Sequence, residues 1–129
     1  MVPTSQLNTE SQPELKEFRL DPGEAIEKVV AEKLLTEKIE LHKRSIRDVR
    51  QDKQGGPAPH ESVSAIVVNM TNPKGHVRIF DGNLQVTTVE GEKNRGKFVI
   101  VVWRPGWRYF YFGEESCEIY HVQKCQPEP

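Results

Sequence analysis

The stretch Lys97-Phe98-Val99-Ile100-Val101-Val102-Trp103-Arg104-Pro105-Gly106-Trp107-Arg108-Tyr109-Phe110-Tyr111-Phe112 holds both tryptophans of the chain and most of its aromatic side chains. Its β-branched and aromatic residues favour strands, and Pro105-Gly106 is a turn dipeptide. The stretch therefore predicts two strands folded about this turn, an aromatic hairpin. Almost nothing polar lies on either face, whereas a sheet with one solvated face alternates apolar with polar residues. We expect cover on both faces, either inside a barrel or sandwich or between a helix and a partner.

The aromatic hairpin carries the residue types that dominate interaction surfaces. Trp, Tyr and Arg are frequent hot spots of protein interfaces, and aromatic rings also stack on bases. For a protein interface the candidates are Trp103, Trp107, Tyr109 and Tyr111. For a small apolar ligand, a peptide or a single-stranded nucleic acid they are Trp103, Arg104, Trp107, Arg108 and Tyr109. A packed hairpin end, with both arginines lying over the rings, is the alternative interpretation.

One long helix is predicted before this β-rich half. Asp21 is a favourable N-cap, Pro22 suits the first helical position, and Glu24 completes a capping-box spacing. Basic residues collect towards the other end, as the helix dipole favours, and a Gly-Gly-Pro run then stops the helix. The helix is expected over residues 21–54, followed by a linker over residues 55–61.

Apolar residues fall on two sides of this predicted helix. One side carries Ile26, Val30, Leu34 and Leu41. The other has alternating spacings of four and three, typical of a short heptad seam, and consists of Leu35, Ile39, His42, Ile46 and Val49. One side can pack on a sheet and the other on a second copy, which predicts a homodimer. A drifting stripe on a bent helix, or two helices with a break, gives the same pattern.

Six strands are predicted over residues 62–125, at 62–70, 76–80 and 84–90, on both sides of Pro105-Gly106, and at 117–124. Short connections with turn residues favour an antiparallel meander. The predicted fold class is α+β, with one long N-terminal helix packed on an antiparallel meander of about six strands, in a single domain over residues 21–125. Residues 1–20 are expected as a flexible tail, in which Leu15, Phe18 and Leu20 can pack as a short strand, and residues 126–129 as a frayed end. The element order is similar to that of cystatin-like folds, an analogy that carries no function.

Composition narrows the class of protein. The 129 residues are 36% hydrophobic and 29% charged, with a formal net charge of −1. Residues 61–129 contain eight basic and eight acidic residues, so a dedicated nucleic-acid module, which needs a basic excess, is disfavoured. The chain opens without a basic-then-apolar signal segment, has no apolar run long enough to cross a bilayer, and has two cysteines. We expect a cytoplasmic protein without membrane contact.

Motifs for catalysis or metal binding are weak. Cys117, His121 and Cys125 have an even spacing, but in a strand each step of four residues spans about 13 Å, too far for one ion. No serine, cysteine or aspartate sits in a nucleophile motif, and His76 and His121 are the acid–base candidates if the protein is an enzyme. The sequence therefore predicts no metal and no cofactor.

The leading hypothesis is a non-catalytic protein-interaction or assembly subunit. It would self-associate through the second helix side and an apolar sheet face. The alternative is a binding module for a small apolar ligand, a peptide or a single strand, through the Trp and Arg residues of the aromatic hairpin.

Overall fold

A computed structural model describes residues 13–46, 63–70, 75–113 and 117–124, which form eight strands and one helix. In chain order the elements are β1 (Leu15–Phe18), α2 (Ile26–Lys33), β2 (Ile39–Ile46), β3 (Val63–Asn69), β4 (His76–Asp81), β5 (Leu84–Glu90), β6 (Phe98–Val102), β7 (Trp107–Phe112) and β8 (Cys117–Lys124). They build a five-stranded sheet in the order β1-β6-β3-β8-β2 and a three-stranded sheet in the order β5-β4-β7. Every strand pair is antiparallel.

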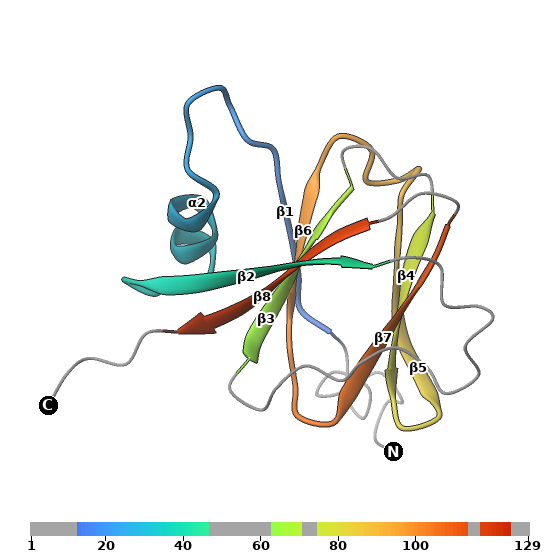
Figure 1. The fold of residues 1–129 in the computed structure, drawn as a ribbon. Coiled ribbons are helices and arrows are strands. Elements are labelled where there is room, and N and C mark those ends of the chain that lie inside the picture. Colours follow the sequence, from blue (N-terminus) through green and yellow to red (C-terminus); the bar gives the residue numbers. More distant parts are fainter. Residues whose placement is uncertain (1–12, 47–62, 71–74, 114–116, 125–129) are drawn as a thin grey trace, which may run out of the picture.

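The described elements form three layers (Figure 1), with the five-stranded sheet between α2 and the three-stranded sheet. Strand β3 lies in the middle and is buried on both faces, since side chains alternate along a strand. Ala65 and Val67 face α2, where they pack with Phe18, Val30, Ala31, Ile39, Phe98, Ile100 and Val122. Ile66 and Val68 face the three-stranded sheet, within the core of Val63, Met70, Val77, Ile79, Val89, Val99, Val101, Trp103, Trp107, Tyr109, Tyr111, Cys117 and Ile119.

The predicted fold class is wrong, because the helix covers eight residues rather than residues 21–54. The capping-box hydrogen bond does form: the Asp21 N–H donates to Glu24 Oε1 at 2.8 Å. It belongs to a turn, however, since the Glu24 N–H donates back to the Asp21 carbonyl and Gly23 has a φ of 88°. Proline followed by glycine at positive φ is the signature of a type II turn. Helix α2 starts only afterwards, at Ile26.

The helix ends without a glycine or a proline. The Leu35 N–H donates to the Glu32 carbonyl and the Thr36 N–H to the Ala31 carbonyl, a Schellman-type ending with Leu35 in the left-handed region at a φ of 56°. Residues Ile39–Ile46 then form strand β2. The apparent heptad therefore joins a helix end to a strand, and the element order that resembled cystatin-like folds is absent.

All six strands predicted over residues 62–125 are present, but they do not form a meander. Among the described strands only β4 and β5 are both consecutive in sequence and paired, about Gly82 with its φ of 61°. Strands β6 and β7 flank Pro105-Gly106 yet belong to different sheets, so the aromatic stretch crosses between layers instead of forming a hairpin. Part of the expected tail, Leu15–Phe18, is strand β1 and pairs with β6. The linker over 55–61 and the end at 126–129 lie outside the described residues.

Candidate functional site

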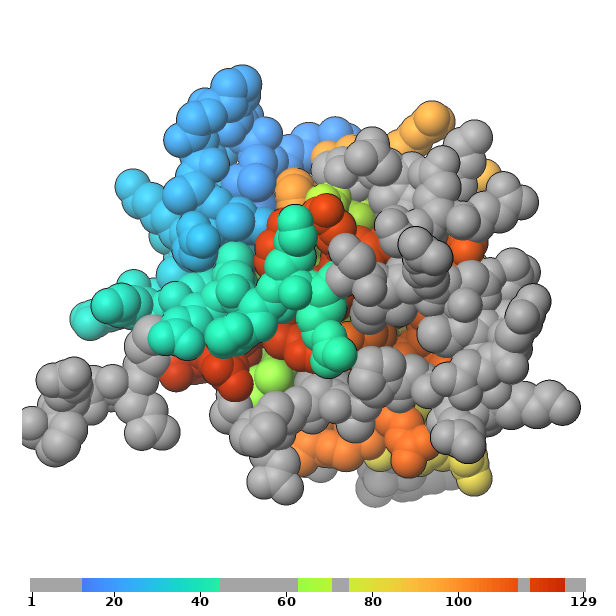
Figure 2. Space-filling model, in the orientation of Figure 1, coloured from blue at the N-terminus to red at the C-terminus, as the bar shows by residue number. Residues whose placement is uncertain are grey.

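The residues predicted for a helix seam do not share a surface. Leu35 follows α2 and is 90% exposed, while Ile39 is buried beneath α2. His42 lies on β2, exposed, beside Gln123 at 3.1 Å. Ile46 belongs to the same strand and Val49 lies outside the described residues. Figure 2 shows β2 lying along the molecular surface next to α2, as an edge strand and not as a second helix face.

The four aromatic residues predicted for an interface come together, but inside the protein. Trp103 meets Trp107 with ring centroids 5.5 Å apart and Tyr109 at 5.9 Å, both edge-on. All four, Tyr111 included, are at most 7% exposed. These rings fill the core between the two sheets, so they do not form an open sheet face.

The two arginines of the aromatic stretch have different surroundings. The Arg104 guanidinium sits 5.9 Å from the centre of the Trp107 ring, as the packed-end interpretation expects. Arg108 is exposed on β7 with the opposite side-chain direction to Trp107 and Tyr109. Of the five residues predicted for ligand binding, three are therefore core and Arg108 alone points to the outer face of the three-stranded sheet.

Tyr109 and His121 form a buried pair between the sheets. The Tyr109 hydroxyl and His121 Nε2 share a hydrogen bond of 2.7 Å. Burial lowers the pKa of His121 to about 4, assisted by the positive charge of Arg44 and by His42. Burial likewise raises the pKa of Tyr109 to about 12 and that of Cys117 to about 12. These groups are uncharged at neutral pH, and the Cys117 thiol is not an activated nucleophile.

The acid–base and metal candidates do not assemble into a site. His76 starts β4 on the outer side of the three-stranded sheet, whereas His121 pairs with Tyr109 on its inner side. Cys117 and His121 lie on β8, and Cys125 is outside the described residues. Across the described part of the chain, no group of three His, Cys, Asp or Glu residues is close enough to hold a metal ion.

An aromatic–arginine face covers the outer side of the three-stranded sheet; it consists of Arg78, Phe80, Arg108, Phe110 and Phe112. On β4 the alternate residues Val77 and Ile79 point into the core, so Arg78 and Phe80 point outwards. The same alternation on β7 sends Arg108, Phe110 and Phe112 outwards. The register places Phe80 opposite Arg108 and Arg78 opposite Phe110, so rings and guanidinium groups alternate in two rows.

The side chains of this face contact one another closely. Phe80 meets Phe110 edge-on at 5.3 Å between ring centroids, and Phe110 lies 6.4 Å from Phe112. The Arg78 guanidinium stands over the Phe112 ring, 4.9 Å from its centre, a cation–π geometry. The Arg78 Nε–H also donates to His76 Nε2 at 3.1 Å. Arg78 is therefore held in place over the sheet.

Three phenylalanines on this face remain half-buried and belong to neither hydrophobic core. In Figure 1 no described helix or strand lies over this side of the three-stranded sheet. Glu90, on β5 at a corner of this face, is 3.6 Å from Lys93, which offsets its negative charge. The two guanidinium groups therefore give the face its positive charge. The sequence signal was present, because β7 is apolar on both faces. What sequence reasoning missed was the contribution of β4, which the pairing of β4 with β7 supplies.

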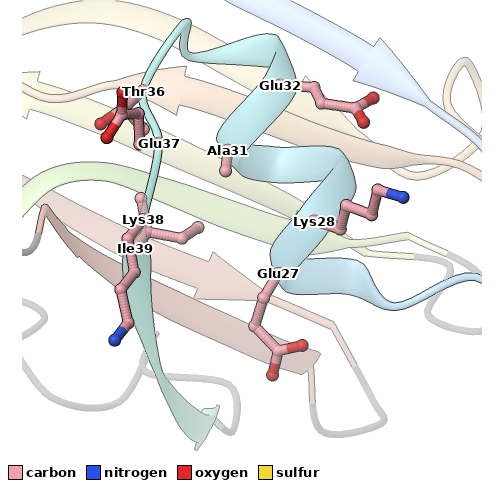
Figure 3. A pocket seen from close by; sticks show the side chains of 8 residues that line it. All are labelled: Glu27, Lys28, Ala31, Glu32, Thr36, Glu37, Lys38 and Ile39. Carbon is pink, nitrogen blue, oxygen red and sulfur yellow. The ribbon is translucent and has the colours of Figure 1, made fainter.

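A groove of about 490 Å³ lies between α2 and the segment that leads into β2. Its lining residues are Glu27, Lys28, Ala31, Glu32, Thr36, Glu37, Lys38 and Ile39. Figure 3 shows that Lys28 and Glu32 on α2 project away from Thr36 and Glu37, so the charged groups do not converge. The groove has mixed charge and no focused set of polar groups for a ligand.

Within the described residues, no helix is both long and apolar enough to cross a membrane. Comparisons of the chain with models of protein families, with curated proteins and with solved structures found no match.

Proposed function

We propose that this protein is a non-catalytic protein-interaction module that binds an acidic, partly apolar segment of a partner protein through the aromatic–arginine face. The observation that carries the proposal is the set of three phenylalanines that lie outside both cores, beside two arginines on the outer face of the three-stranded sheet, over which no described helix or strand lies. Phenylalanine and arginine are enriched in the centres of protein interfaces, and lysine and glutamate are depleted there. The three rings are half-buried, so part of their apolar surface stays accessible, and apolar patches on a protein surface mark such sites.

The apolar composition of β7 on both of its faces points to the same surface. One face of strand β6 packs against α2, and its other face packs against the three-stranded sheet. On one face of strand β7 the side chains of Trp107, Tyr109 and Tyr111 are part of the core between the sheets. Its other side carries Phe110 and Phe112, which a partner would cover. Burial of apolar surface on both sides is what the composition of β7 favours.

The charge of the face favours an acidic partner over a second copy of this chain. Arg78 and Arg108 stand on the two strands that form the face, and the Glu90 carboxylate already faces Lys93. Packing two such faces together would bring guanidinium groups near guanidinium groups, which like-charge repulsion disfavours. Glutamate or aspartate side chains of a partner would instead accept hydrogen bonds from both arginines.

Binding can be tested with a fluorescein-labelled peptide in which glutamates alternate with phenylalanines and leucines. The comparison peptide has lysines in place of the glutamates, and the readout is fluorescence anisotropy. We expect the acidic peptide to bind and the lysine peptide to bind much more weakly. Phe110→Ser should weaken binding of the acidic peptide about 5- to 30-fold, the effect of truncating an interface hot spot.

A charge swap separates this face from other surfaces. Arg108→Glu should weaken binding of the acidic peptide and strengthen binding of the lysine peptide. Arg104→Glu makes the same change beside Trp107, away from the face, and should leave both affinities unchanged. Equal binding of both peptides by the wild type, or an unaltered affinity in Phe110→Ser, would contradict the proposal. Binding of a thymidine oligonucleotide in place of the acidic peptide, lost in Phe110→Ser, would assign the face to single-stranded nucleic acid instead.

A further inference from the structure

The edge strands of the two sheets differ in how they are protected against pairing with another strand. At one end of the five-stranded sheet, β1 has only four residues. At the other end, β2 carries the charged or polar residues Glu40, His42, Lys43 and Arg44. Short length and charged side chains are the usual devices that block edge-to-edge association. Both edges of the larger sheet are therefore protected.

Strand β5, an edge of the three-stranded sheet, lacks both devices. It runs for seven residues, and none of the six from Leu84 to Val89 is charged. Val86, Thr87, Thr88 and Val89 are β-branched, which suits an extended and paired backbone. Leu84 is 66% exposed at the start of the strand. Within the described part of the chain β5 pairs with β4 alone, so one row of its backbone groups faces outwards.

A bulge limits the part of this edge that is regular. The register shifts between Ile79 and Phe80, where Ile79 pairs with Thr87 and Phe80 pairs with Gln85. A bulge interrupts hydrogen bonding and twists the strand, which protects the first half of β5. The regular part is Thr87–Glu90, where the ladder with β4 continues as far as the pair His76 and Glu90.

We propose that β5 pairs antiparallel with β5 of a second copy, which makes one six-stranded sheet across a homodimer. Pairing about Thr88 sets Thr88 opposite the partner's Thr88 on the outer side and Thr87 opposite the partner's Val89 on the core side. Pairs of threonines and of β-branched residues across strands are favourable. The segment from Leu84 to Val89 offers no charge for a foreign strand to recognise, whereas a second copy brings the same uncharged segment; Glu90, at the end of the strand, faces Lys93. The two-fold axis is then normal to the sheet, so both aromatic–arginine faces lie on one side.

The dimer does not depend on the proposed partner, because the five residues that define the aromatic–arginine face lie on β4 and β7. The contact is small compared with stable interfaces, so we expect a dimer whose population rises with concentration. Light scattering on a sizing column should show a mass that moves from the 14.8 kDa of one chain towards twice that value. Concentrations from about 1 µM to 1 mM cover the affinities that such contacts reach.

Two variants that carry opposite charges at Thr88 give the sharpest test of the dimer. Thr88→Lys and Thr88→Glu each put like charges face to face across the two-fold axis, so each variant alone should remain a monomer. An equal mixture should recover the wild-type dimer mass, because lysine then faces glutamate. Thr36→Lys, the same substitution in the segment after α2, should dimerise like the wild type.

Three results would overturn the pairing: a wild type that is monomeric at every concentration, a Thr88→Lys variant as dimeric as the wild type, or a mixture that stays monomeric. The lysine introduced by Thr88→Lys would stand opposite Arg78 in the register with β4 and can reduce folding stability, so circular dichroism is recorded for each variant. Should Thr88→Lys not fold, amide hydrogen exchange of the wild type gives the answer. Protection of the Thr87–Glu90 amides must then rise with concentration, and constant protection would contradict the dimer.

Discussion

Acidification should destabilise this protein through one residue, His121. The side chain is 7% exposed and its Nε2 shares a hydrogen bond with the Tyr109 hydroxyl. The folded protein holds the pKa of His121 at about 4, below the 6.5 of an unperturbed histidine. Between these two values the unfolded chain binds a proton at His121 and the folded chain does not. Stability is therefore complete above pH 6.5 and is lost as the pH falls from 6.5 towards 4.

The size of the effect follows from the difference in pKa. Two and a half pKa units correspond to a limiting loss of about 3 kcal/mol in the free energy of unfolding. At pH 5, with the folded form still mostly neutral, the loss is about 2 kcal/mol relative to pH 8. For a domain of this size that is a large share of a total stability of about 5–15 kcal/mol. Arg44 and His42, on the neighbouring strand, oppose the charged form further.

Urea unfolding at pH 8, 6.5 and 5, followed by tryptophan fluorescence, measures this loss. His121→Gln keeps a hydrogen-bonding side chain beside Tyr109 but cannot gain the proton. Its stability should lie below that of the wild type at pH 8, and the gap should shrink by about 2 kcal/mol by pH 5. Carboxylates titrate equally in both proteins and cancel in the comparison. A gap that stays constant from pH 8 to pH 5 would refute the reasoning.

Two backbone predictions concern other parts of the fold. Leu35→Gly should raise the free energy of unfolding by about 0.5–1 kcal/mol in thermal or urea melts, because Leu35 is exposed at a positive φ that glycine adopts without strain; a loss of stability would instead favour a buried Leu35. Gly75→Ala should cost about 2 kcal/mol or more, since the new methyl group would overlap the Phe112 carbonyl and lie 2.8 Å from the Cα of Gly113. Gly106→Ala, with open space but a φ of 86°, should cost only about 1 kcal/mol, and equal costs would contradict the close approach.

Strands of the second half could be predicted from the sequence because each reads as a bounded apolar run. Strand β3 is apolar on both faces, and the structure buries both, between α2 and the three-stranded sheet. Local patterns of this kind reflect burial, and for β3 the expected burial on both faces is present. They do not record which strands become neighbours, since β6 followed by a Pro-Gly turn and β7 fits a hairpin and a crossing between sheets equally well.

The helix prediction failed in a segment whose apolar residues fit both the helical spacing and the alternation of a strand. Leu35, Ile39 and His42 have helical spacing, but Ile39 and Leu41 also alternate with polar residues as in a strand. The helix ends at Lys33, and the left-handed residue that follows, Leu35, is not a glycine, so the sequence carries no conventional stop signal there. Burial of Ile39 beneath α2 favours the strand over a longer helix. This contact forms only in the folded protein, so the local sequence does not show it.

The candidate site was predictable only in part. The sequence placed the aromatic residues of β7 on two faces and suggested that both need cover, but the residues selected from it lie mostly on the face that forms the core. Arg108 alone among the selected residues lies on the outer face. Phe80 and Arg78 lie on β4, and nothing local in the sequence pairs that strand with β7. The site is created by long-range pairing, so its composition followed only from the structure.

The most direct test of the proposed binding face is a nuclear magnetic resonance titration of the isotope-labelled protein with the acidic peptide. We predict that the largest amide shifts map to β4 and β7, around Phe80, Phe110 and Phe112, with little change on β1 or α2. Phe110→Ser should abolish most of these shifts at the same peptide concentration. Shifts centred on α2 and β2, beside the groove, or shifts that persist unchanged in Phe110→Ser, would contradict the account.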